Sequence, residues 1–153
     1  MKKKIAGLLD TEYITPTKED LERRFKEYNE KYFDGVLPPC KFTVVRMKNH
    51  SSATYFIKEQ KIRIAKNVYW TNETLKLTLI HEMVHHYVKT RFNYTPNFFS
   101  HGRRYRKVCR MLRKKHGLKV NLYELPLEHW KGEKKPSLLK EVMYHFITLI
   151  LPF

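Results

Sequence analysis

The amino-acid sequence predicts an α+β fold: a small three-stranded sheet that contains an antiparallel pair, two helices packed against it, and a basic third helix. Two observations support this prediction. Three segments repeat apolar residues at helical spacing, and three short segments rich in β-branched and aromatic residues lie between the first two of them. The chain has 153 residues, 42% of them hydrophobic, which suits one domain with a packed core.

The first helix is predicted to begin after Pro16 and to run to about Phe33. Thr17 is a suitable N-cap, because its hydroxyl can accept a hydrogen bond from the first turn, and acidic residues follow it directly. Asp34 and Gly35 are expected to end the helix.

The three predicted strands span residues 41–47, 53–57 and 61–65. The first is β-branched and aromatic, and the third alternates polar and apolar residues. Only three residues separate the second strand from the third, and a link this short is typical of a hairpin.

The second helix is predicted over residues 72–90, with Thr71 or Asn72 as its N-cap. It contains the pattern H-E-x-x-H, in which His81 and His85 are four residues apart. Two imidazoles at this spacing share one helix face about 6 Å apart, which is suitable for gripping one zinc ion. Glu82 would lie beside that metal, where its carboxylate can accept a proton from the attacking water.

A catalytic zinc ion usually has three protein ligands and one open position, so a third ligand is needed. The metzincin pattern requires a glycine and a histidine three and six residues after the second histidine, where this chain has Val88 and Arg91. The thermolysin pattern requires an acidic residue on the next helix, but no Asp or Glu occurs between Glu82 and Glu124. Both patterns are therefore excluded.

Three nearby histidines remain as candidates for the third ligand: His86, His101 and His116. His86 points about 100° away from His85 on the helix, and a core-edge position is expected for it. His116 lies near a helix C-terminus, where a capping role is more natural. His101 follows a loop long enough to turn the chain back, so it is the best third ligand by geometry.

The third helix is predicted to begin near His101 and to end near Gly117, with an apolar stripe on one side. The chain has a formal net charge of +16, and basic residues cover the other faces of this helix. We expect non-sequence-specific contacts with the phosphates of DNA, against the alternative of a solvated basic face without a ligand. The candidate contacts are Arg103, Arg104, Arg106, Lys107, Arg110, Arg113, Lys114 and Lys115.

Residues 81–85, followed by His101-Gly102-x-x-Tyr105, resemble the SprT-like domain, the catalytic domain of the Spartan-type metalloproteases. Residues 25–38 also resemble the first helix of that family. The resemblance covers roughly residues 21–117. It implies a zincin-like fold and a zinc metalloprotease, with Zn²⁺ held by His81, His85 and His101 and with Glu82 as the catalytic base.

In the eukaryotic branch, the resemblance further implies that the substrates are proteins crosslinked to DNA and that DNA switches cleavage on. Many members carry a C-terminal zinc ribbon with paired cysteines, whereas residues 131–153 of this chain contain no cysteine. The competing hypothesis is a nucleic-acid-binding protein in which one zinc ion is only structural. Glu82 separates the two hypotheses, because a structural site has no need of a base.

Two details of a peptidase site stay open. A donor besides zinc would have to stabilise the oxyanion, and Tyr87, His86 and Tyr94 are the candidates. An extended substrate could pair with an edge strand of the sheet, either residues 53–57 or residues 61–65. Tyr94, Phe98 and Phe99 could stack on unpaired bases, with ordinary loop packing as the alternative.

We expect an N-terminal tail at residues 1–15, the SprT-like domain at 16–127, and a linker with an apolar C-terminal segment at 128–153. That apolar segment is shorter than the roughly 18 to 20 residues of a spanning helix, and the N-terminal apolar stretch is too short for a secretory signal. Cys40 and Cys109 form no C-x-x-C pair, which argues against a disulfide scaffold. A cytoplasmic monomer is expected, associated with the nucleoid if it binds DNA.

Overall fold

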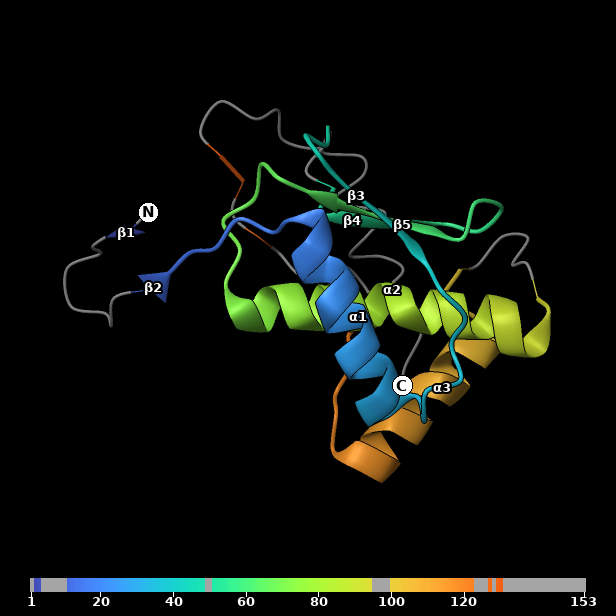
Figure 1. Ribbon diagram of the computed structural model, residues 1–153. Coiled ribbons are helices and arrows are strands. Elements are labelled where there is room, and N and C mark those ends of the chain that lie inside the picture. Colours follow the sequence, from blue (N-terminus) through green and yellow to red (C-terminus); the bar gives the residue numbers. More distant parts are fainter. Residues whose placement is uncertain are drawn as a thin grey trace, which may run out of the picture.

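The computed structural model describes residues 2–3, 11–48, 51–94, 100–122, 127 and 129–130. Within these residues three helices and a mixed three-stranded sheet form an α+β fold, as the sequence predicts (Figure 1). The elements in chain order are β1 (Lys2–Lys3), β2 (Thr11–Glu12), α1 (Lys18–Tyr32), β3 (Lys41–Val45), β4 (Ala53–Phe56), β5 (Lys61–Ala65), α2 (Asn72–Phe92) and α3 (Arg103–His116).

The three-stranded sheet has the order β3-β5-β4. β4 and β5 form the expected antiparallel hairpin, whereas β3 pairs with β5 in parallel. β5 is therefore central, and the prediction that residues 61–65 could offer a free edge is wrong, because both sides of β5 are paired. β4 is an edge strand, since no described strand pairs with its other side.

α1 begins as the sequence predicts. The Thr17 hydroxyl accepts a hydrogen bond from the backbone N–H of Asp20 at 3.1 Å. The helix ends at Tyr32, and Asp34 and Gly35 then adopt positive φ angles of 55° and 68°. The Asn29 side chain bonds both backbone groups of Leu37, at 3.0 and 3.1 Å, and so fixes the loop that leads to β3.

α2 is the central helix of the domain. Figure 1 shows it beneath the sheet, with α1 and α3 crossing it. Thr71 is its N-cap, in a capping box with Thr74, and the helix extends to Phe92 before Asn93 closes it in the left-handed conformation at φ 44°. Most of its circumference is buried, so α2 presents side chains to the sheet, to α1 and to α3 at once.

α3 begins at Arg103 rather than at His101, and Gly102 is its N-cap. Gly117 ends it at φ 65°, and the predicted stripe packs inward through Tyr105, Val108 and Leu112. In the part of the chain that the structure describes, no helix combines the length and apolar character needed to cross a membrane. The apolar segment expected within residues 128–153 lies outside the described residues, apart from positions 129–130.

Candidate metal centre

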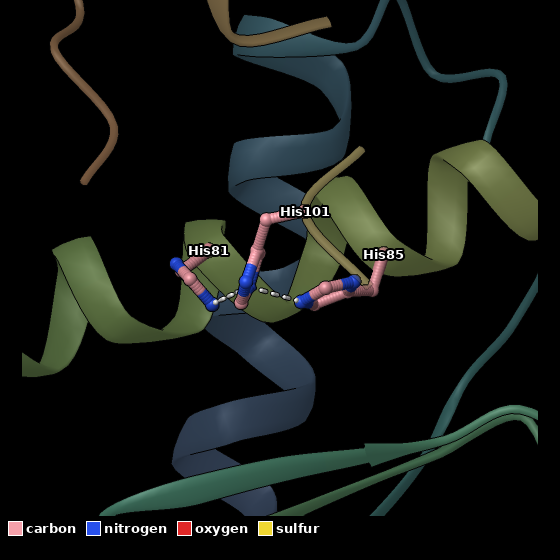
Figure 2. Close-up of side chains that lie close together, drawn as sticks. All are labelled: His81, His85 and His101. Carbon is pink, nitrogen blue, oxygen red and sulfur yellow. Dashed lines mark hydrogen bonds between the residues drawn. The ribbon is translucent and has the colours of Figure 1, made fainter. Parts of the chain in front are cut away.

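The structure brings together three histidines from two segments. α2 positions His81 and His85 one turn apart on the same face, and His101 reaches them from the segment that precedes α3 (Figure 2). Nε2 of His101 lies 3.1 Å from Nε2 of His81 and 3.1 Å from Nε2 of His85. The three ring nitrogens form a group that could hold a metal ion.

Two of the three nitrogen separations are close to those of a zinc site. Zinc–nitrogen bonds of about 2.0–2.1 Å at tetrahedral angles would separate two ligand nitrogens by about 3.3 Å. His101 Nε2 lies 3.1 Å from each of the other two nitrogens, and all three ligand atoms lie within 4.8 Å of one another. Nε2 of a neutral His101 can donate a hydrogen to only one of the two other nitrogens, whereas a cation between the rings would satisfy all three.

The tautomer of His81 is set by a backbone carbonyl. Nδ1 of His81 lies 2.7 Å from the carbonyl oxygen of Asn121. A carbonyl can only accept, so Nδ1 carries the proton and donates it, and Nε2 is left with a lone pair directed at the other two histidines. Orientation of a ligand histidine by a carbonyl on its second nitrogen is the usual arrangement in metal sites.

The three imidazoles are neutral at neutral pH. Burial lowers the pKa of His81 to about 4 and that of His101 to about 3. Burial, followed by the charges of the other two histidines, lowers the pKa of His85 to about 2. Neutral imidazole is the form that binds a metal ion, so no proton has to be displaced from these rings near pH 7.

Tyr105 packs against the whole group. Its ring centroid lies 5.4, 4.6 and 4.7 Å from those of His81, His85 and His101. Its hydroxyl donates to the backbone carbonyl of His81 at 3.3 Å, and the side chain is buried. The sequence placed Tyr105 in the motif that follows His101 and on the apolar stripe of the third helix, but it assigned this residue no role in the site. No sequence signal indicated the Asn121 carbonyl.

Glu82 directly follows His81 on α2 and is buried, with 4% of its surface exposed. Burial raises the pKa of the Cys40 thiol to about 12, and the charge of Glu82 adds to that effect. The same charge adds to the rise that burial produces in the pKa of Tyr105. The carboxylate therefore lies within electrostatic reach of the segment before β3 and of α3.

His86 is not part of the group. It is fully buried, its Nε2 lies 2.9 Å from the carbonyl oxygen of Pro38, and its Nδ1 lies 2.9 Å from the hydroxyl of Tyr55. Since the carbonyl can only accept, Nε2–H donates to Pro38 and Tyr55 donates to Nδ1. His86 therefore joins α2 to β4 and to the loop after α1. With both ring nitrogens occupied, it is unsuited to stabilise an oxyanion.

The other named candidates lie at different places. The ring of His116 packs edge-on against Tyr32, at 5.5 Å between centroids, so His116 is outside the group. The ring of Tyr87 packs near Phe33, at 5.8 Å. Tyr94 lies under the guanidinium of Arg104, at 4.0 Å. Phe98 and Phe99 lie outside the described residues.

The basic residues of α3 are largely at the surface. Seven of the eight candidates are exposed and Arg106 is partly buried. Lys115 is already paired with Asp34, at 2.6 and 2.7 Å. A hollow of about 370 Å³ opens at the start of the helix, and Arg103, Arg104 and Lys107 contribute to its wall. Arg103, Arg104 and Lys107 therefore place exposed positive charge in the first turns of α3, which follow His101 in the chain.

The comparison with protein families agrees with this arrangement. The model of the SprT-like family matches residues 21–124, which is more than half of the chain and includes all three histidines and Glu82. The comparison with curated proteins gives no match. Because the match covers most of α1, all of β3 through α3 and the histidine group, the chain belongs to the SprT-like family.

Proposed function

We propose that the chain is a zinc-dependent endopeptidase with one zinc ion per chain, held by His81, His85 and His101 in a zincin-like arrangement. One observation carries the proposal: three neutral ring nitrogens converge beside a buried carboxylate, Glu82. Membership of the SprT-like family supports it, because the family is associated with metalloprotease-type domains.

Zinc, when bound, polarises a peptide carbonyl as a Lewis acid and lowers the pKa of a water molecule to about 7. The protein's own groups do the rest. The Glu82 carboxylate accepts a proton from the attacking water and then delivers it to the leaving amine. The hydrogen bond to Asn121 holds the His81 ring with Nε2 free, and the Tyr105 ring supports the imidazoles from one side.

An extended substrate would pair with the open edge of β4. Ala65 donates its backbone N–H to the Ser52 carbonyl at 2.8 Å, and such hydrogen-bonded pairs alternate along an antiparallel ladder. The main-chain groups of Ala53 and Tyr55 therefore point away from β5, toward the side that no described strand covers. The Ala53 carbonyl already accepts hydrogen bonds from the hydroxyls of Ser51 and Thr54, so we propose that Tyr55 provides the main contacts with a peptide strand.

The proposed domain spans residues 16–127, flanked by residues 1–15 and 128–153. The beginning of α1 at Lys18 and the family match at residues 21–124 support the first boundary. We take the working unit to be a monomer, because all three histidines come from one chain.

Glu82→Gln tests the catalytic role most sharply, because the variant keeps the size of the side chain and loses only the base. We expect cleavage of an unfolded protein substrate to fall by at least about a hundredfold, with zinc content and melting temperature unchanged. Cleavage at the wild-type rate by a zinc-loaded Glu82→Gln protein would favour the alternative, a nucleic-acid-binding protein with a structural zinc ion.

We also propose that the exposed basic face of α3 binds DNA without sequence preference, so that DNA-bound or DNA-crosslinked proteins are the substrates. The position of this face next to His101 supports the proposal. Reversing the charge of the exposed Arg110 and Arg113 should weaken DNA binding and reduce its salt dependence. Salt-insensitive binding by the wild type, or equal binding by this variant, would contradict it.

A further inference from the structure

A second hollow lies at the C-terminal end of β4, beside the turn that follows this strand. It has a volume of about 630 Å³ and is lined by residues 55–60 and by Lys89 of α2. Sites that bind small ligands usually enclose about 300–1,000 Å³. The hollow is therefore large enough for part of a peptide, and it belongs neither to the histidine group nor to the basic face of α3.

Lys89 of α2 connects the hollow with the histidine group. Lys89 follows His85 by four residues, so it continues the face that carries His81 and His85 and lies about 6 Å further along the helix axis. On the opposite side, the hollow begins at Tyr55, whose main-chain groups face the open edge of β4. A peptide paired with that edge and passing the histidines would reach the hollow.

The wall formed by β4 is held in place. The Tyr55 side chain points toward α2 and is fixed by its hydrogen bond of 2.9 Å to the buried His86. Phe56 points to the other face of the sheet, where the guanidinium of Arg63 lies 4.5 Å from its ring centroid. Ile57 lies in the turn that follows β4 and also lines the hollow. The apolar groups of the lining are Tyr55, Phe56, Ile57 and the aliphatic stem of Lys89.

The rim of the hollow is positively charged. Lys58 and Lys89 line it, and the carboxylate of Glu59, which also lines it, is paired with Lys61. A cationic substrate side chain would be repelled at this rim, whereas an apolar side chain could pass between the lysines and bury itself against Tyr55 and Ile57.

We propose that this hollow is a specificity site that receives one bulky apolar side chain of the substrate, such as Leu, Met or Phe, at a fixed distance from the scissile bond. The inference rests on the proposed peptidase function and deepens it, since it names a feature of the substrate. A pocket of this kind discriminates a large apolar side chain from alanine by about tenfold or more in kcat/KM.

The experiment begins with cleavage of a random peptide mixture by the full-length, zinc-loaded protein. Bulky apolar residues should be enriched at one position relative to the cut. Two peptides that differ only by Phe or Ala at that position then give the ratio of kcat/KM, which should be about tenfold or more. Ile57→Trp fills the hollow and should bring the ratio near one, because the Phe peptide loses the site that favours it over the Ala peptide.

Val45→Trp is the matched control. Val45 is 37% exposed and lies on β3, at the opposite edge of the sheet, so the same added bulk should leave the ratio as it is in the wild type. If Ile57→Trp does not fold, Ile57→Phe should lower the ratio part of the way. A wild type that cuts without preference, or an Ile57 variant that keeps the full preference, would overturn the inference.

Binding separates this inference from the proposed function. The full-length Glu82→Gln protein should bind the labelled Phe peptide more tightly than the Ala peptide in a fluorescence anisotropy titration, and Ile57→Trp should remove the difference. Equal binding of the two peptides would overturn the specificity site. Selective binding that Ile57→Trp removes, in a protein whose wild type cuts no peptide, would overturn the peptidase function and leave the site standing.

Discussion

His85 and His86 are neighbours in the sequence, yet their ring nitrogens do different things. Both nitrogens of His86 have protein partners, each at 2.9 Å. Nε2 of His85 instead faces Nε2 of His101 at 3.1 Å. Burial lowers the pKa of both residues, so burial does not separate them. The hydrogen-bond partners do separate them: the ring nitrogens of His86 bond a carbonyl and a hydroxyl, whereas Nε2 of His85 faces the ring nitrogen of another histidine and can bind a cation there.

The largest expected difference between His85 and His86 is in the amount of zinc that the protein retains when each is replaced. His85→Ala removes one of three ring nitrogens from the proposed zinc site, so zinc content should fall from about one per chain to near zero. His86→Ala should retain the zinc ion, because both partners of His86 are protein groups. Elemental analysis after dialysis against a weak chelator measures both. Loss of zinc in both variants, or in neither, would break the distinction.

The free energy of unfolding should depend on the two histidines in the opposite order, with His86→Ala destabilising the protein more than His85→Ala. His86→Ala leaves a cavity and two polar groups without their partner, the Tyr55 hydroxyl and the Pro38 carbonyl. We expect the free energy of unfolding of the metal-free protein to fall by about 3 kcal/mol. Urea unfolding in the presence of a chelator checks this value. His85→Ala under the same conditions should cost clearly less, because the partner of its Nε2 among the described residues is another histidine of the group.

Several positions in the fold and in the histidine group could be predicted from the sequence alone. The i, i+4 spacing of His81 and His85 became a shared face because helix geometry is local, and the end of α3 followed from Gly117. Exclusion of other ligand patterns selected His101, which the structure places 3.1 Å from both other nitrogens. Local chemistry was enough for these positions.

The rest depended on contacts between distant residues. The Asn121 carbonyl that orients His81 is a backbone group forty residues away, and every residue type carries such a group. The partners of His86 come from β4 and from the loop after α1, at sequence separations of 31 and 48. The central place of β5 likewise results from a parallel pairing with β3 that no short pattern encodes. Sequence periodicity carries no information about such pairings.

A fall in pH should destabilise the metal-free protein through its histidine group. The pKa of His81 is about 4 and that of His101 about 3 in the folded protein, against 6.5 in the ordinary state. Both groups stay neutral in the fold while the unfolded chain takes up protons, so their contribution to stability is complete above about pH 6.5 and is lost as the pH falls toward 4. The melting temperature of the chelated protein should therefore decrease as the pH is lowered across this range. A flat profile would show that these pKa values are not depressed.

The smallest expected effect concerns the hydroxyl of Tyr55. Tyr55→Phe keeps the ring and removes one hydrogen bond to His86, so the free energy of unfolding should fall by about 1–2 kcal/mol. Zinc content should not change. Tyr32→Phe, in a core tyrosine near the end of α1, is the control and should have a smaller effect. Equal losses in the two variants would mean that the bond to His86 contributes nothing specific.

X-ray absorption at the zinc edge of the purified full-length protein tests the central claim most directly. We predict three imidazole nitrogens at about 2.0–2.1 Å and one oxygen ligand at the position left open for water. Substitution of His101 should remove one nitrogen or the whole metal. Sulfur scattering at about 2.3 Å would bring Cys40 or Cys109 into the site. That result, or a zinc site unaffected by the loss of His101, would contradict the account.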